Sequence, residues 1–216
     1  MRYLLCALIG YAVGTINPAY LISKLRGFDI RKQGSKNAGA SNALLLLGKS
    51  IGVFCGLFDI FKATLVIWLM EWIFSDLPYV FAVTGTACIL GHIFPFYMNF
   101  RGGKGLSSLG GMILAYDWRV FLIMLAGEFV IAFVSNYLCF VSLTASVIFP
   151  VVYLILRRDL LGALILMVAG ACIIWRHREN LKRIQAGTEA RFSYLWNKEN
   201  EIARVKENES KQSKDA

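Results

Sequence analysis

The sequence predicts an all-α protein, a polytopic membrane helix bundle of about seven transmembrane helices. Two observations lead to this fold class. Apolar residues make up 57% of the chain and its mean hydropathy is +0.56, which is too apolar for an ordinary soluble domain. Long apolar runs also recur from one end of the 216-residue chain to the other, separated by short polar links.

The apolar runs give the expected positions of the helices. A hydrocarbon core of about 30 Å needs about 20 helical residues, so the first three runs and the sixth are long enough to span it. The fourth covers only about half the bilayer, and we expect either a half-helix or a span shielded by its neighbours there. In order, the runs are Tyr3–Ile22, Ala43–Trp72, Pro78–Met98, Leu106–Tyr116, Val120–Phe133, Tyr137–Leu156 and Leu160–Trp175.

The distribution of basic residues predicts the orientation. The segment Lys24–Lys36 contains five basic residues and one acidic residue, while the link at Ser75 and Asp76 has no basic residue. Since cytoplasmic loops are enriched in Lys and Arg, the first segment is expected in the cytoplasm. The N-terminus is then outside and, after seven crossings, the C-terminus is cytoplasmic.

The chain is expected to divide into an integral membrane domain, residues 1–196, and a charged cytoplasmic tail, residues 197–216. The tail mixes Lys, Glu, Asn and Ser with few apolar residues. Segments of this composition bury too little apolar surface to fold alone, so we expect a solvated, partly disordered extension without catalytic residues.

Three polar, glycine-rich clusters are separated by apolar runs: GSKNAGASN (34–42), GHIFPFYMNFRGGKG (91–105) and WRHRENLKRIQAGTE (175–189). The expected topology puts all three on the cytoplasmic side, where they can converge on one site. Glycine turns let backbone N–H groups point at phosphate oxygens, and lysine adds the charge. The net charge of +9 is compatible with anionic lipid, nucleic acid or a phosphorylated substrate, and the clusters favour the phosphorylated substrate.

Two other features of the sequence, the segment 43–50 and the five cysteines, could suggest a nucleotide site or a metal site, but neither pattern supports one. Residues 43–50, ALLLLGKS, fit the loosest nucleotide-binding loop, but all four variable positions are leucine and no strand precedes them, so we expect the start of a helix. The five cysteines are scattered without Cys-x-x-Cys spacing or a paired histidine. They are expected to be packing residues, and no metal is implied.

Asp59 and Lys62 stand three residues apart in the second apolar run. Residues at this spacing share one face of a helix. Charges at membrane depth are costly, so the two are expected to pair and to face the bundle interior, as a structural ion pair more than as a catalytic one.

Six segments together resemble the bacterial membrane acyl-phosphate:glycerol-3-phosphate acyltransferase family. They are GTINP (14–18), FDIRKQGSKNAGASN (28–42), FDIFKA (58–63), GHIFPFYMNFRGGKGLSS (91–108), SNYLCFVSL (135–143) and RHRENLKRIQAGTEARFS (176–193). The resemblance implies a seven-helix, multi-pass enzyme of the bacterial inner membrane, a monomer with its active site on the cytoplasmic side. It would transfer a fatty acyl group from acyl phosphate to the sn-1 hydroxyl of glycerol 3-phosphate, giving lysophosphatidic acid and phosphate, the first step of phospholipid synthesis.

The resemblance also implies the site residues, and it implies membrane lipid as a partner, with no cofactor, metal or nucleic acid. Catalytic roles fall to Lys104, Ser142 and His177, and substrate binding to Ser35, Asn37, Gly102, Gly103 and Asn180. To the substrate-binding residues we add Lys36, which departs from the family pattern. Acyl phosphate is already activated, so the protein needs no covalent nucleophile. It must hold two phosphate groups close together and stabilise the oxyanion. The proton of the attacking hydroxyl can go to His177 or to a phosphate oxygen of the substrate, and we favour the substrate oxygen.

Two positions depart from the family pattern. Lys36 stands where the family loop usually has glycine, and Leu45 stands where the family usually has an arginine that binds the acceptor phosphate. We expect Lys36 to supply the missing charge, although a lysine lacks the bidentate fork of arginine. The alternatives are a divergent paralogue that binds a phosphorylated ligand or lipid with an altered acceptor or little activity, and a small transporter of phosphorylated metabolites. The chain shows no internal repeat, which argues against the transporter.

Overall fold

The computed structural model describes residues 1–212, and all regular structure in this part of the chain is helical. Three short 3₁₀ helices, Ile30–Lys32, Phe96–Met98 and Phe192–Leu195, lie between the α-helices. The α-helices are α1 Arg2–Thr15, α2 Pro18–Leu25, α3 Ala40–Leu47, α4 Lys49–Ile73, α5 Val80–Ile93, α6 Leu106–Tyr116, α7 Trp118–Ser135, α8 Leu138–Arg157, α9 Leu160–Gln185 and α10 Lys198–Gln212.

Six segments within residues 1–212 are long and apolar enough to cross a membrane, and α6 is a shorter apolar helix. The predicted all-α membrane bundle is therefore confirmed, with the fourth apolar run as the short member. The six segments are Arg2–Leu25, Lys49–Ile73, Val80–Met98, Trp118–Ser135, Leu138–Arg157 and Leu160–Gln185. The short helix lies in the middle of the bundle, where α4, α5, α7 and α8 contact it.

Two of the predicted continuous helices each divide into two α-helices, and the third ends at Ile93, before the 3₁₀ helix Phe96–Met98. The first run breaks at Asn17, whose side-chain oxygen accepts a hydrogen bond from the N–H of Tyr20 and caps α2. Pro18 cannot continue α1, because it has no N–H to donate. The second run breaks at Gly48, whose φ of 101° favours glycine. The pattern ALLLLGKS spans this second break, so residues 43–47 belong to the end of α3 and the predicted helix start lies at Lys49, the first residue of α4.

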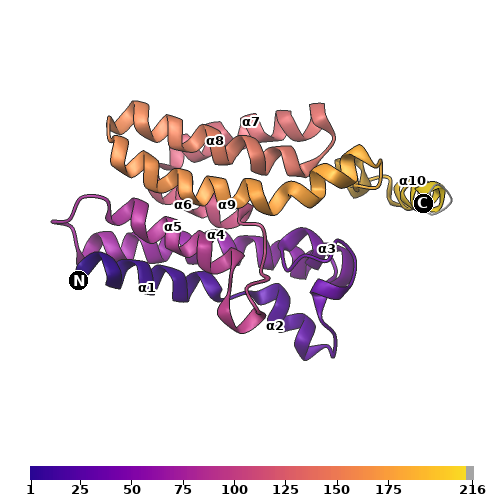
Figure 1. The fold of residues 1–216 in the computed structure, drawn as a ribbon, viewed down its shortest axis with the longest axis horizontal. Helices are drawn as coiled ribbons and strands as arrows, with labels where there is room; N and C mark the ends of the chain where they lie inside the picture. Colours follow the sequence, from indigo (N-terminus) through magenta and orange to yellow (C-terminus); the bar gives the residue numbers. More distant parts are fainter. Residues whose placement is uncertain (213–216) are drawn as a thin grey trace.

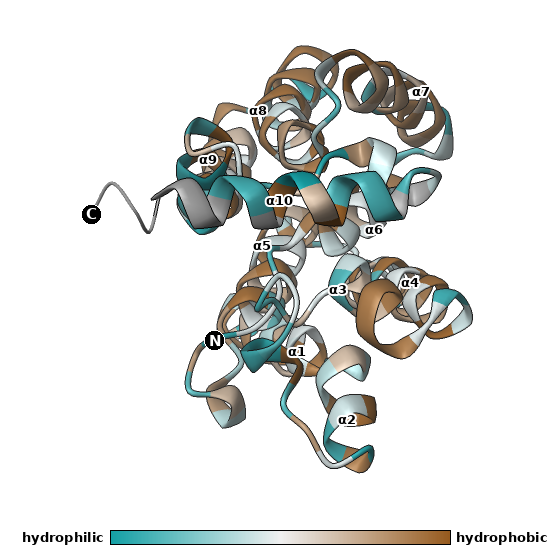
Figure 2. Ribbon diagram, turned by 90° about the vertical axis from the view of Figure 1, so that its right-hand side faces the viewer, coloured by the Kyte–Doolittle hydropathy of each residue, from teal (hydrophilic) through white to brown (hydrophobic). Residues whose placement is uncertain are grey.

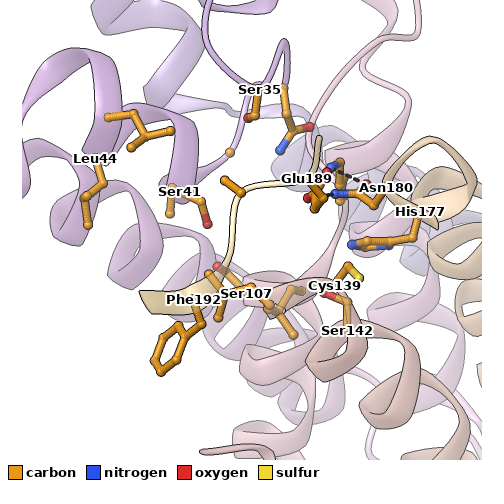
Figure 3. A pocket seen from close by; sticks show the side chains of 18 of the residues that line it. Ser35, Ser41, Leu44, Ser107, Cys139, Ser142, His177, Asn180, Glu189 and Phe192 are labelled. Carbon is orange, nitrogen blue, oxygen red and sulfur yellow. Dashed lines mark hydrogen bonds between the residues drawn. The ribbon is translucent and has the colours of Figure 1, made fainter. Parts of the chain in front are cut away.

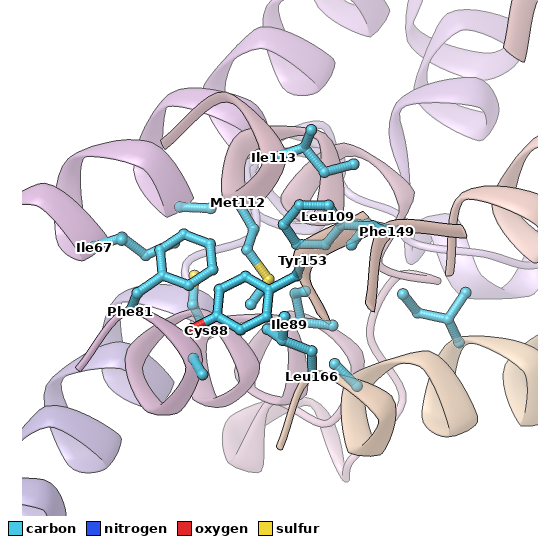
Figure 4. Close-up of a cluster of buried hydrophobic side chains, with 14 of the residues drawn as sticks. Ile67, Phe81, Cys88, Ile89, Leu109, Met112, Ile113, Phe149, Tyr153 and Leu166 are labelled. Carbon is cyan, nitrogen blue, oxygen red and sulfur yellow. The ribbon is translucent and has the colours of Figure 1, made fainter. Parts of the chain in front are cut away.

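The interior combines large side chains with close backbone contacts at glycine. Phe81 of α5 and Tyr153 of α8 stack with ring centroids 5.8 Å apart, inside a buried cluster from α4, α5, α6, α8 and α9 (Figure 4). A Cβ added at Gly14 would lie 2.1 Å from the carbonyl oxygen of Cys88, so α1 and α5 touch backbone to backbone. Membrane helices pack closely at small residues because lipid provides no hydrophobic driving force for their association, so van der Waals contact must supply the attraction.

The cysteines are free thiols, and the outer surface of the bundle is apolar. All five cysteines are free thiols, four of them buried, and no group of three or more potential metal ligands occurs among the described residues. Large apolar side chains are exposed along α1, α4, α7, α8 and α9. Figure 2 shows α4, α7 and α8 largely in the apolar colour, while α10 is mostly hydrophilic.

The polar links gather at the two ends of the bundle as alternating crossings require. At one end, Arg2 forms an ion pair with Asp76 at 2.6 Å, and the guanidinium of Arg157 lies over the ring of Tyr116. At the other end lie α2, α3 and the last part of α9 (Figure 1). The three glycine-rich clusters thus share one end of the bundle, which we call the polar end.

The tail differs from the prediction. Residues 198–212 form α10 instead of a partly disordered extension. Arg204 holds this helix in place, since its guanidinium donates to the carbonyl oxygens of Gly187 at 2.6 Å and Glu189 at 2.7 Å and pairs with Glu201 at 2.8 Å. These contacts cross from the tail to the third cluster, and composition alone cannot reveal them. Residues 213–216 of the predicted tail lie outside the described residues.

The orientation in the membrane stays a prediction, and Ser41 offers a test of it, because its side chain is exposed at the polar end. A single cysteine at this position in a cysteine-free chain should resist a membrane-impermeant thiol reagent in intact cells and react after lysis. Labelling of intact cells would place the polar end outside.

Candidate active site

The three clusters meet around one cavity of about 370 Å³ at the polar end (Figure 3). Its wall includes α3, the N-terminal ends of α6 and α8, the last part of α9, and a segment running from Glu189 to Tyr194. Six of the nine predicted site residues line it: Ser35, Asn37, Lys104, Ser142, His177 and Asn180. The expectation that the clusters converge is therefore confirmed.

A buried asparagine shapes the first loop. The side-chain N–H₂ group of Asn42 contacts the carbonyl oxygens of Ile30, Gln33 and Asn37, each at 3.0 Å. Its oxygen accepts the N–H of Ser35 at 2.9 Å. The loop therefore closes around one polar side chain, and this places Ser35 and Asn37 at the cavity wall.

Lys36 lies between these two residues but outside the cavity wall. It is exposed, and its φ of 54° is in the left-handed region that favours glycine. Leu45, by contrast, lines the cavity from α3. The binding of the acceptor phosphate by Lys36 stays a prediction, tested below.

Gly102 and Gly103 pack against the end of α5 and do not line the cavity. Their N–H groups donate to the carbonyl oxygens of Ile93 at 3.0 Å and His92 at 3.1 Å. The expectation that these two N–H groups point at phosphate is wrong, because both bonds are made inside the fold. A Cβ at Gly103 would lie 2.0 Å from Nε2 of His92, so glycine is needed for close approach.

Lys104 follows this tight segment and enters the cavity wall. Burial lowers the pKa of its ammonium group to about 8; the carboxylate of Glu189 opposes this shift, and Arg183 and Arg176 reinforce it. Its Nζ donates to Oδ1 of Asn180 at 2.6 Å. Asn180 in turn donates to Glu189 at 2.6 Å, so the lysine is held by a chain of hydrogen bonds.

The start of α6 adds a second favourable environment for an anion. Gly105, with a φ of 91°, is the N-cap of α6, and Leu106 and Ser107 from its first turn line the cavity. The first N–H groups of a helix have no partner within the helix and carry the positive end of its dipole. Lys104 and this helix end together suit a phosphate group.

His177 and Asn180 share one face of α9, as their spacing predicts, and both are buried. Nδ1 of His177 lies 2.8 Å from the carbonyl oxygen of Ile173. Since a carbonyl can only accept, Nδ1 carries the proton in the neutral ring, and Nε2 is left with a lone pair that can accept one. Ser142 is buried near the start of α8 and lines the cavity beside Cys139 (Figure 3).

The predicted pairing of Asp59 with Lys62 is confirmed, with Oδ1 and Nζ 2.6 Å apart and both side chains buried. Sequence reasoning missed that Asp59 and His92 reach the cavity wall. It also missed Glu189, whose second oxygen pairs with Arg183 at 2.6 Å. His92 and Glu189 both stand inside the glycine-rich clusters, which was the available signal.

Comparison with known proteins agrees with this geometry. A protein-family model described as glycerol-3-phosphate acyltransferase matches residues 4–187. The glycerol-3-phosphate acyltransferase of Rubrobacter xylanophilus is 33% identical over 192 residues, which cover 89% of this chain and 96% of the relative. That of Thermotoga petrophila is 35% identical over 194 residues, 89% of this chain and 98% of the relative.

Solved structures give the same result. The crystal structure of PlsY (YgiH), an integral membrane glycerol 3-phosphate acyltransferase, in its glycerol 3-phosphate form is 32% identical with a TM-score of 0.82, covering 90% of this chain and 98% of that one. Its lysophosphatidic acid form is 31% identical with a TM-score of 0.79. The chain thus belongs to the glycerol-3-phosphate acyltransferase family.

Proposed function

We propose that this membrane protein transfers a fatty acyl group from acyl phosphate to the sn-1 hydroxyl of glycerol 3-phosphate, and that it releases lysophosphatidic acid and phosphate. The observation that carries the proposal is the cavity in which Lys104 and the N-terminus of α6 meet. The related PlsY structures in their glycerol 3-phosphate and lysophosphatidic acid forms support this acceptor and product. The reaction takes place at the cytoplasmic face of the bacterial inner membrane, and the enzyme acts as a monomer.

The lining supports a substrate with both a phosphate and an acyl chain. The polar side of the cavity carries Ser35, Asn37 and Lys104. Another part of the wall is apolar and includes Leu44, Leu45, Leu106, Leu138 and Phe192. A fatty acyl group is accommodated along such a surface while its phosphate faces the cation.

The chemistry requires electrostatics more than a nucleophile. Acyl phosphate is a mixed anhydride, and attack by a hydroxyl expels phosphate without an acyl-enzyme intermediate. Lys104 and the first N–H groups of α6 screen the two phosphate groups and stabilise the oxyanion, while Ser142 and Asn180 align the reactants.

The attacking hydroxyl loses its proton to a phosphate oxygen of the substrate. Nε2 of His177 is the second acceptor that the geometry allows, and His177→Gln separates the two: a loss of turnover above about 10³-fold assigns the proton to the imidazole.

A second candidate is a divergent paralogue that binds a phosphorylated ligand with little transfer. Leu45 favours it, because Lys104 and Arg191 are the only lysine or arginine side chains among the described residues that line the cavity. Arg191 lies 3.9 Å from the carboxylate of Glu201 and is 44% exposed. The transporter reading loses support, since the polar clusters gather at one end of the bundle and not at mid-depth.

The direct test uses purified protein with palmitoyl phosphate and glycerol 3-phosphate. We expect lysophosphatidic acid and phosphate in equal amounts, with no product from palmitoyl coenzyme A. Lys104→Ala should lose at least about 10²-fold in turnover, the scale of removing one preorganised electrostatic contact, and Ser142→Ala should lose less. Binding of glycerol 3-phosphate without any transfer by the unaltered protein would support the paralogue instead.

The pKa of Lys104 predicts the pH dependence. A lysine with a pKa of about 8 is charged below that pH and neutral above it. The ratio kcat/KM reports ionisations of the free enzyme, so it should fall as the pH rises through about 8. Lys104→Arg moves this limb out of the accessible range, because a guanidinium stays charged. A limb that persists in the arginine variant would belong to another group or to the substrates.

The two departures from the family pattern can be tested together. Lys36→Gly should raise the KM for glycerol 3-phosphate at least about tenfold, or about 1.4 kcal/mol, and leave the KM for acyl phosphate nearly unchanged. Adding Leu45→Arg should restore much of this loss, since position 45 faces the cavity. The glycine fits the left-handed backbone at position 36, so a change in KM would not come from strain. A silent Lys36→Gly, with activity appearing only on Leu45→Arg, would favour the paralogue.

A further inference from the structure

A buried charged network lies at the inner wall of the cavity, which two of its members, Asp59 and His92, line. Nζ of Lys62 is 2.6 Å from Oδ1 of Asp59 and 3.2 Å from Nδ1 of His92. The same carboxylate oxygen is 3.4 Å from Nδ1 of His92. All three side chains are 3% exposed. Ionisable groups at such depth in a membrane bundle are costly, which makes a role beyond packing worth seeking.

One contact of the network reaches the first glycine-rich loop. Nζ of Lys62 donates to the carbonyl oxygen of Ile16 at 2.6 Å, at the break between α1 and α2. The next residue, Asn17, donates from its side chain to the carbonyl oxygen of Ala38 at 2.8 Å. Lys62 therefore fixes the backbone at the break between α1 and α2, and Asn17 connects this break to the loop that carries Ser35.

Another contact reaches the second loop. The carbonyl oxygen of His92 accepts the N–H of Gly103, and Nε2 of its ring lies against the α-carbon of the same glycine. A shift of this ring would displace Gly103, and Lys104 follows it directly. The position of His92 therefore sets the backbone that delivers the lysine to the cavity.

Lys62 is held inside the fold. Its Nζ lies within hydrogen-bond distance of the carbonyl oxygen of Ile16, Oδ1 of Asp59 and Nδ1 of His92. Lys62 is also absent from the cavity wall, although Asp59 and His92 line it. Lys62 therefore acts through the backbone and the side chains that it contacts.

We infer that Asp59, Lys62 and His92 form a positioning unit, which fixes the first loop and the Gly102–Lys104 segment at one separation so that Ser35 and Lys104 face the same cavity. Its effect on turnover rests on the proposed function. Its effect on the two loops does not, and the two can be measured separately.

The test compares the unaltered protein with Asp59→Asn/Lys62→Met. Removing both charges at similar volume avoids leaving one buried charge unpaired, so the bundle should still fold. Backbone amide hydrogen exchange in lipid nanodiscs should accelerate at least about tenfold in peptides covering residues 33–42 and 99–106, since exchange reports local opening. Peptides covering residues 74–79 and 118–135 should be unchanged. Turnover should fall at least about tenfold, the scale on which small misplacements act.

Two further variants keep the result decisive. Glu128→Gln is the matched control, because Glu128 is another buried carboxylate, bound to Thr144 at 2.7 Å and absent from the cavity wall. It should change neither exchange nor turnover. His92→Gln takes the place of the double variant if that variant does not insert. It removes the ring from Gly103 while keeping a polar side chain, and it should accelerate exchange only in residues 99–106.

The outcomes separate the inference from the proposed function. Unchanged exchange in both loops, or an equal rise in every peptide, would show an ion pair that merely stabilises the bundle and would overturn the inference. Faster loop exchange with turnover within about threefold of the parent would also overturn it, because small effects of this size fall below what positioning requires. Absence of transfer in the unaltered protein would overturn the proposed function alone, since the exchange results still decide the loops.

Discussion

The helices at the polar end of the bundle can be interrupted only under one constraint. A carbonyl group that has lost its helical hydrogen bond at membrane depth must find another donor inside the protein. Lipid offers none, and an unsatisfied group costs several kcal/mol. Side chains from other elements supply the bonds. Tyr97 donates to the carbonyl of Thr15, Lys62 to that of Ile16 and Tyr11 to that of Phe94. These bonds allow irregular backbone where a membrane bundle otherwise permits only helix.

The same bonds explain why a substrate site can form there. A regular helix exposes no backbone donors along its length, whereas a broken one presents a new N-terminus, as α6 does after Gly105. The glycines before it allow the chain to turn back against α5. Lys104 then arrives at the cavity already desolvated, with Asn180 as its neutral partner. A bound phosphate meets a cation whose hydrogen bond goes to a neutral amide.

The third cluster is held differently, by charge pairs outside the bundle. Glu189 joins Asn180 and Arg183, and Arg204 of α10 binds the carbonyl of the same glutamate. The segment that follows Glu189 forms part of the cavity wall as far as Tyr194, and Figure 3 shows its side chains at Glu189 and Phe192. The tail helix thus supports the segment that forms part of the cavity wall, and no described side chain of α10 lines the cavity itself.

The sequence by itself determined the membrane bundle, the clustering of the three polar segments, the pairing of Asp59 with Lys62 and the shared face of His177 and Asn180. Each follows from hydropathy or helical period, which are local properties. Only the tertiary structure decided that the N–H groups of Gly102 and Gly103 donate to carbonyl oxygens at the end of α5 and that Lys36 lies outside the cavity. It also decided that His92 joins the buried pair and that α10 contacts the third cluster. These outcomes depend on which donor meets which acceptor across distant segments, and packing sets those meetings, because a local pattern carries no information about its partner.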